Sequence, residues 1–189
     1  LEIQREGKLP PAIMKVADKD PVRLFTSVAK SKGLDTHEES ARQIADEWTK
    51  LAFDLKHKFK RSRPWDLMKE EDVPLKPNKT SSTESPSYPS GHSMLGYGVA
   101  EFYKNKYPYM SDEWDNLADI IQHSRLLGGV HFPSDNKASK YVVDWVVNNE
   151  KIAADSHVET RRKQRAKYLD PKDLKKIESR VKKTKDLPE

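Results

Sequence analysis

The stretch SYPSGHS, residues 87–93, places a proline, a glycine, three serines and a histidine directly before an apolar run. Serine followed by glycine at 90 and 91 is typical of a helix start, where the hydroxyl caps free backbone amides. The apolar residues that follow recur at helical spacing and predict a helix to about Lys106, with the stripe Leu95, Val99, Phe102 and Tyr103. His92 then has two interpretations: a polar residue in a capped turn, or a group placed for chemistry.

Three further segments show the apolar periodicity of amphipathic helices. The first segment starts at about residue 37 and ends before Arg63-Pro64. The second runs from Ser111 to Gly128-Gly129, and the third from about residue 134 to about residue 152. We expect Ser111 to cap the second of them. The tryptophans on these stripes are expected in the core, namely Trp48, Trp114 and Trp145. Four prolines between residues 71 and 90 predict a loop, and no strand-like alternation is sustained, so the predicted fold class is all-α.

Length and composition narrow the class of protein. With 189 residues, the chain is long enough for one domain with a substantial core. It contains no cysteine, which excludes disulfides, thiolate metal sites and a cysteine nucleophile. No apolar run has the roughly 18 residues of a transmembrane helix, and no signal-peptide pattern is visible. We therefore expect a soluble protein, and its compartment stays open.

Positive charge is concentrated at the end of the chain. Residues 151–189 hold 13 Lys or Arg against 7 Asp or Glu, while the whole chain carries a formal net charge of +5. We divide the chain into an N-terminal arm at 1–36, a helical domain at 37–152 and a basic helical extension at 153–189. The prolines of the arm predict irregular or short-helical chain, with residues 22–29 as its best helix candidate. The extension has two interpretations, a solvated helix or a contact with nucleic acid, an anionic membrane or an acidic partner. Its narrow apolar stripe also allows docking on the same chain or on a second copy.

Three separated stretches each bring a cation or an imidazole to the edge of a predicted helix. They are KHKFKRSRP at 56–64, PSGH at 89–92 and SRLLGGVHFPSD at 124–135. Taken singly, each has a plain structural interpretation. Cations complement a helix C-terminus, PSG is an ordinary helix start, and a lone histidine is usually a packing residue.

Together, the three stretches resemble the signature of the phosphatidic-acid-phosphatase type 2 and vanadium haloperoxidase superfamily. That signature is Lys-x6-Arg-Pro, then Pro-Ser-Gly-His, then Ser-Arg-x5-His-x3-Asp, and all eleven fixed positions are filled here. Within the superfamily the chain is most similar to soluble bacterial class A nonspecific acid phosphatases, through SYPSGH, Gly129 and Ser134-Asp135. The resemblance covers about residues 38–150. It implies a compact all-α bundle of the acid phosphatase and vanadium haloperoxidase type, and a periplasmic or secreted location.

The resemblance also implies roles for the two histidines. His131 is the nucleophile that forms a phosphohistidine, and Asp135 holds its other ring nitrogen. His92 is the general acid that protonates the leaving oxygen. Since His92 must then be protonated while His131 is not, we expect a mildly acidic pH optimum.

Elementary phosphate chemistry supports the same site. Phosphoryl transfer requires positive donors around the three non-bridging oxygens, and Lys56, Arg63 and Arg125 supply them. The Ser90 hydroxyl and the Gly91 amide lie at a predicted helix start, where free amides favour an anion. We expect no metal, and interpret the acidic residues at 70–72 as a solvated loop.

The sequence thus predicts an acid phosphatase that hydrolyses small-molecule phosphate monoesters without a cofactor and that vanadate inhibits. Two alternatives stay open. One is a vanadate-dependent haloperoxidase, against which the short chain argues, with vanadate as cofactor attached at His131. The other is a catalytically silent structural or binding protein that retains the fold. Trp65, Phe132 and Pro133 depart from the usual family residues and are expected near the substrate mouth, so the substrate stays open.

Overall fold

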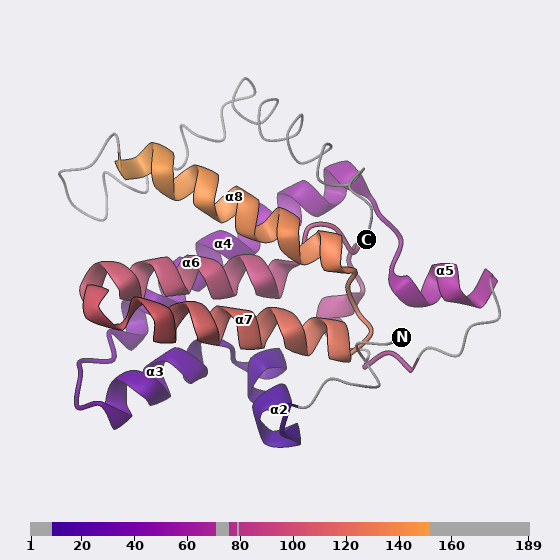
Figure 1. Cartoon of the computed structure of the whole chain (residues 1–189). Coiled ribbons are helices and arrows are strands. Elements are labelled where there is room, and N and C mark those ends of the chain that lie inside the picture. Colours follow the sequence, from indigo (N-terminus) through magenta and orange to yellow (C-terminus); the bar gives the residue numbers. More distant parts are fainter. Residues whose placement is uncertain (1–8, 71–75, 79, 152–189) are drawn as a thin grey trace.

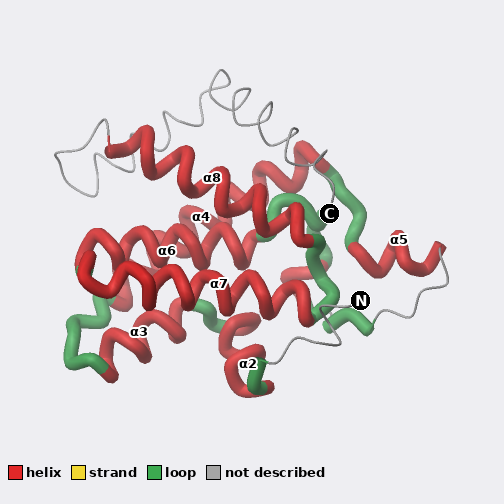
Figure 2. Tube along the Cα trace, viewed as in Figure 1, coloured by secondary structure: helices red, strands yellow, loops and turns green. Residues whose placement is uncertain are grey.

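The computed structural model describes residues 9–70, 76–78 and 80–151, and every regular element within these ranges is a helix (Figures 1 and 2). The predicted all-α class is therefore confirmed for these residues. The helices are α2 (Pro11–Lys19), α3 (Val22–Ser31), α4 (Glu38–Phe59), α5 (Pro64–Glu70), α6 (Gly91–Lys106), α7 (Ser111–Leu127) and α8 (Pro133–Lys151), with short 3-10 turns η1 (Ser81–Thr83) and η2 (Pro108–Met110). Within the described part of the chain, none of these helices is both long and apolar enough to cross a membrane.

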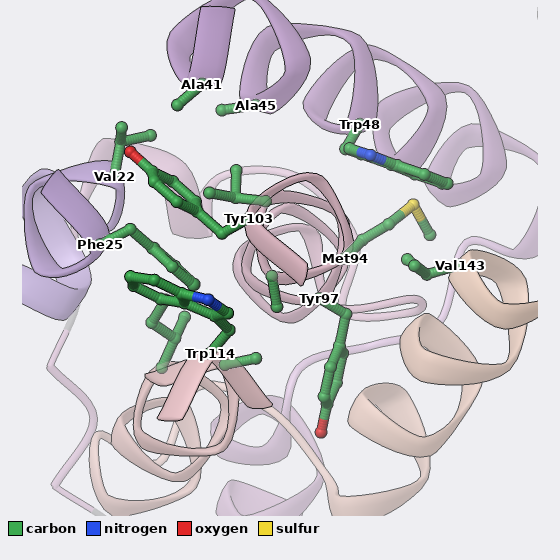
Figure 3. Packing of buried hydrophobic residues seen from close by; sticks show 14 of the residues in the cluster. Val22, Phe25, Ala41, Ala45, Trp48, Met94, Tyr97, Tyr103, Trp114 and Val143 are labelled. Atoms are coloured by element: carbon green, nitrogen blue, oxygen red, sulfur yellow. The ribbon is translucent and has the colours of Figure 1, made fainter. Parts of the chain in front are cut away.

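Helix α6 lies at the centre of the bundle, and α4, α7 and α8 pack around it. Figure 3 looks along α6 and shows the core side chains of the neighbouring helices around it. A Cβ atom at Gly98 would lie 2.0 Å from Trp48 Nε1, and one at Gly96 would lie 3.2 Å from Ile121 Cδ1. Gly98 therefore allows the Trp48 indole of α4 to approach α6 closely, and Gly96 does the same for Ile121 of α7.

Residues 9–36, expected as a separate arm, share the core of the bundle. The Phe25 ring stacks on Tyr103 with centroids 5.6 Å apart and on Trp114 with centroids 6.3 Å apart (Figure 3). Val22 and Ala17 are also buried in this cluster. The helix expected at 22–29 is present as α3. Helix α2 was not predicted, since the prolines around it suggested irregular chain, but Pro11 occupies its first position, where a missing amide proton has no cost.

The predicted helix boundaries agree with the structure in most places. Helices α4 and α6 follow the expected ranges, and Ser90 caps α6 by accepting a hydrogen bond from Ser93 N at 3.4 Å. The prediction that Ser111 caps α7 is wrong. Met110 takes the capping position, and the Ser111 hydroxyl donates to Pro108 O at 2.7 Å because the η2 turn leads directly into α7. Helix α5 was not predicted.

Trp48 and Trp114 lie in the core as expected, and Trp145 is partly buried against it. Helix α8 begins at Pro133, one residue before the expected start, and is described to Lys151. The predicted basic extension at 153–189 and its apolar stripe lie outside the described residues, as do residues 1–8 of the predicted arm.

Candidate active site

The three motif stretches meet beside the start of α6. The amide of Ser87 donates to Arg61 O at 2.9 Å, which joins the segment after α4 to the loop before α6. The amide of Ser90 donates to Asp135 O at 3.2 Å, and Ser139 Oγ donates to Ser90 O at 2.8 Å, so α8 is tied to the same loop. Hydrogen bonds, contacts and electrostatic interactions connect all the sequence-predicted site residues here: Lys56, Arg63, Ser90, Gly91, His92, Arg125, His131 and Asp135.

Two left-handed residues turn the chain into this site. Lys60 follows α4 with φ of 48° and donates its amide to Lys56 O at 2.9 Å, which closes the last turn of the helix. Gly129 follows α7 with φ of 63°, a conformation that glycine adopts without a Cβ clash. α7 ends and α8 begins at the right-hand end of the bundle in Figure 1, so this reversal sets His131 at the start of α8.

His131 is held by Asp135 in one tautomer. Its Nδ1 lies 3.0 Å from Asp135 Oδ2, and its Nε2 lies 3.1 Å from Arg63 Nη1. Because an ionised carboxylate only accepts and a guanidinium only donates, this network assigns the proton to Nδ1 and leaves Nε2 unprotonated, with its lone pair accepting from Arg63. His131 is 5 % exposed, and burial holds its pKa well below the usual value. A neutral imidazole with Nε2 as the basic nitrogen is the form that a nucleophile requires.

The Asp135 carboxylate is saturated with donors. Oδ2 also accepts the amide of Phe132 at 2.9 Å and the hydroxyl of Ser87, while Oδ1 accepts Arg61 Nη1 at 2.9 Å. Burial opposes its ionisation, but the hydrogen bond from His131 and the other donors outweigh burial and keep the pKa of Asp135 below its usual value. Asp135 is thus an ionised, fixed partner for the imidazole.

Arg61 and Ser87 are site residues that the sequence reasoning missed. The Arg61 guanidinium lies 4.0 Å from the Phe132 ring centroid, and its Nη1 also donates to Ser134 Oγ at 2.6 Å. Arg61 holds Asp135 Oδ1, and Ser87 donates to Oδ2, the oxygen that also contacts His131. Arg61 lies in the stretch KHKFKRSRP at 56–64. Its charge was not assigned to the site there, because cations at the end of a helix have a simpler interpretation.

The three predicted cations are buried close to one another. Burial lowers the pKa of Lys56 to about 7, and repulsion from Arg63 adds to this shift. Burial likewise lowers the pKa of Arg63 to about 10 and lowers that of Arg125. Lys56 Nζ donates to the carbonyls of Pro86 and Ser87. A concentration of buried positive charge of this kind is unfavourable by itself and is relieved by an anion.

Arg125 has donors that the described residues leave without an acceptor. Its side chain is 4 % exposed, and Nη1 is bonded to the carboxylate of Asp18. Nε and Nη2 are buried and have no hydrogen-bond partner among the described residues. Buried polar groups in proteins are almost always paired, and Nε with Nη2 forms an edge of the guanidinium that fits two oxygens of a phosphate.

The start of α6 contributes three of the predicted site residues, Ser90, Gly91 and His92. Ser90 Oγ accepts from Ser93 N at 3.4 Å and lies 2.9 Å from Ser93 Oγ. The single proton of the Ser93 hydroxyl goes to Asn136 Oδ1 at 2.7 Å, so the Ser90 hydroxyl donates to Ser93 Oγ. A Cβ at Gly91 would lie 3.8 Å from Lys56 Cε, so this helix terminus lies against the lysine. Free amides at such a terminus attract an anion.

His92 has Nε2 at 2.8 Å from the backbone carbonyl of Asp18 on α2. Burial and, after it, the positive charge of Arg125 lower the pKa of His92 to about 4. This value lies below the one that a mildly acidic optimum would require. A bound anion offsets the repulsion between His92 and the cations, and so raises the pKa of His92.

Trp65 and Phe132, expected near the substrate mouth, are 8 % and 9 % exposed and pack on arginines. The Trp65 ring centroid lies 5.7 Å from the Arg63 guanidinium carbon. Both rings therefore pack against cations of the site.

Comparisons of the chain with protein-family models, with curated proteins and with solved structures found no match.

Proposed function

We propose that this chain is a phosphoric monoester hydrolase of the phosphatidic-acid-phosphatase type 2 and vanadium haloperoxidase type, closest to the class A acid phosphatases. The single observation that carries the proposal is the buried Arg125 edge, whose Nε and Nη2 lack an acceptor among the described residues. Around it stand Lys56, Arg63 and the basic nitrogen of His131. A tetrahedral dianion supplies the acceptors and the negative charge that this cluster needs.

The first chemical step follows from these positions. His131 Nε2 attacks phosphorus in line with the ester oxygen, the P–N bond forms and the P–O bond breaks. Arg63 Nη1, bonded to Nε2 at 3.1 Å, transfers its hydrogen bond to a phosphate oxygen as the nitrogen attacks. Protonated His92 gives its proton to the leaving oxygen from Nδ1, because Nε2 is held by the Asp18 carbonyl. Asp135 stabilises the positive charge that develops on the His131 ring.

The second step returns the enzyme to its starting state. Neutral His92 accepts a proton from water, the water oxygen attacks phosphorus, and the P–N bond breaks to release phosphate and neutral His131. Lys56, Arg63 and Arg125 neutralise the equatorial oxygens in both steps. These side chains supply the charge that the transfer requires, so the proposed reaction uses no metal ion.

Hydrolysis of p-nitrophenyl phosphate by the purified chain between about pH 5 and pH 7 tests this proposal. We expect turnover that resists a chelator, is inhibited by vanadate and is lost in His131→Ala, with an acid-labile phosphohistidine trapped from the wild type. His57→Ala is the matched control, since His57 is exposed on α4 and packs only on Phe53 among the ring contacts of the described residues. Bromide oxidation by peroxide after vanadate loading, without phosphatase turnover, would instead indicate the haloperoxidase. Silence in both assays would indicate a non-catalytic protein.

A further inference from the structure

The last turn of α2 reaches into the candidate site, although α2 lies outside all three motif stretches. Asp18 is the residue that makes the contact, and its side chain is 10 % exposed. Its carboxylate is bonded to Arg125 of α7, and its carbonyl accepts from His92 of α6. A single residue thus joins one predicted phosphate ligand to the predicted general acid.

The Asp18 carboxylate determines which edge of Arg125 is offered to a ligand. Asp18 Oδ1 takes Nη1, while Nε and Nη2 have no partner among the described residues. The carboxylate and a phosphate would therefore use different edges of one guanidinium and would not compete. A guanidinium has a rigid planar fork, so fixing Nη1 also fixes the direction of the Nε and Nη2 protons.

The Asp18 carbonyl determines which nitrogen of His92 is available. This carbonyl belongs to the last turn of α2, where backbone oxygens lack partners within the helix. A carbonyl only accepts, so the 2.8 Å bond assigns a proton to His92 Nε2. Nδ1 is then the nitrogen that exchanges a proton with the substrate.

We infer that Asp18 is a positioning residue for the phosphoryl transfer: its carboxylate aims Arg125 at the phosphate, and its carbonyl aims His92 Nδ1 at the leaving oxygen. This inference rests on the proposed function. The alternative is that the Asp18 carboxylate acts as an internal anion that competes with phosphate, and the two predict opposite effects of its removal.

The test compares Asp18→Ala, Asp18→Asn and Asp18→Glu in the full chain, with kcat and KM for p-nitrophenyl phosphate and the Kd of inorganic phosphate by calorimetry. Asp18→Ala should lower kcat/KM by about 10- to 100-fold, the usual loss when the partner that orients a ligand is removed, and should weaken phosphate binding. Asp18→Asn should recover most of both, because its amide oxygen can accept the same bond from Arg125. Asp18→Glu keeps the charge but displaces the carboxylate, and should lower kcat with an unchanged melting temperature.

Asp20→Ala is the matched control. Asp20 ends the same helix and also pairs with an arginine, Arg42, at 3.0 Å, but away from the site. We expect it to leave kcat and the phosphate Kd unchanged. If Asp18→Ala fails to fold, the Asp18→Glu variant still decides the outcome through kcat.

Wild-type kinetics in Asp18→Glu and Asp18→Ala, or tighter phosphate binding in Asp18→Ala or Asp18→Asn, would overturn the inference. A wild-type chain that neither hydrolyses the ester nor binds phosphate would overturn the proposed function itself. The two failures are therefore distinguishable, because the first requires an active wild type.

Discussion

Anion binding at this site should depend on the protonation of Lys56. Burial lowers the pKa of Lys56 to about 7, so the side chain is largely charged at pH 6 and largely neutral at pH 8. Sulfate is a suitable probe, because it is a tetrahedral dianion throughout this range and contributes no titration of its own. If only the charged lysine binds it, the affinity should fall by about tenfold from pH 6 to pH 8, which is about 1.4 kcal/mol.

Calorimetry in buffers of different ionisation enthalpy measures this linkage directly. Wild-type protein should take up close to one proton per sulfate at pH 8 and far less at pH 6, because Lys56 is already charged there. Lys56→Met should bind weakly and show no loss of affinity above pH 7. Lys50→Met removes an exposed lysine from the same helix and should keep the wild-type dependence. His92, with a pKa of about 4, adds its own uptake mainly at the acidic end.

A sulfate affinity that stays constant from pH 6 to pH 8, or a dependence that survives in Lys56→Met, would refute the reasoning. The same pKa has a consequence for stability with a definite sign. Because the folded pKa lies below the unfolded value of 10.5, the unfolded chain binds more protons between these values. The free energy of unfolding should therefore rise with pH from about 7 towards 10.5, by up to roughly 5 kcal/mol relative to Lys56→Met.

Three further predictions follow from single contacts. Gly98→Ala should lower the free energy of unfolding by about 1 to 3 kcal/mol in urea titration, since a Cβ would overlap the indole on α4 at 2.0 Å; an unchanged midpoint would contradict the packing of α4 on α6. Nitrogen NMR should find His131 protonated at Nδ1 and not at Nε2 at neutral pH, and the opposite tautomer would invalidate Nε2 as the nucleophile. Arg61→Met should lower kcat by about 10- to 100-fold with little change in KM, because Arg61 donates to the carboxylate that orients His131. Arg42→Met, which removes an exposed ion pair, should leave both constants unchanged.

Most helix positions could be predicted because their signals are local. Ser90 caps α6 as its neighbours indicate, and the apolar stripe of α4 matches its buried face. Ser111 failed as a cap because the preceding η2 turn supplies the geometry that a cap would otherwise provide. Helix α2 was missed because its flanking prolines suggested irregular chain, while its helical state depends on packing against α7.

The candidate site was predictable only to the extent of its motif residues. Arg61 and Ser87 bind the Asp135 carboxylate, which lies 74 and 48 residues away in the sequence. The residues next to them in the sequence do not indicate this contact. Asp18 lies 74 residues from His92 and 107 from Arg125, so no spacing rule connects them.

By itself the sequence determined the all-α class, the start of α6 and the set of imidazole and cationic groups, because periodicity, capping and residue chemistry act over a few neighbouring positions. Tertiary structure alone decided the protonation of those groups. The lowered pKa of Lys56 and of His92 arises from burial and from cations that other parts of the chain bring close. Tertiary structure also decided that Asp18 joins the site, since only packing of α2 against the bundle brings its carboxylate to Arg125.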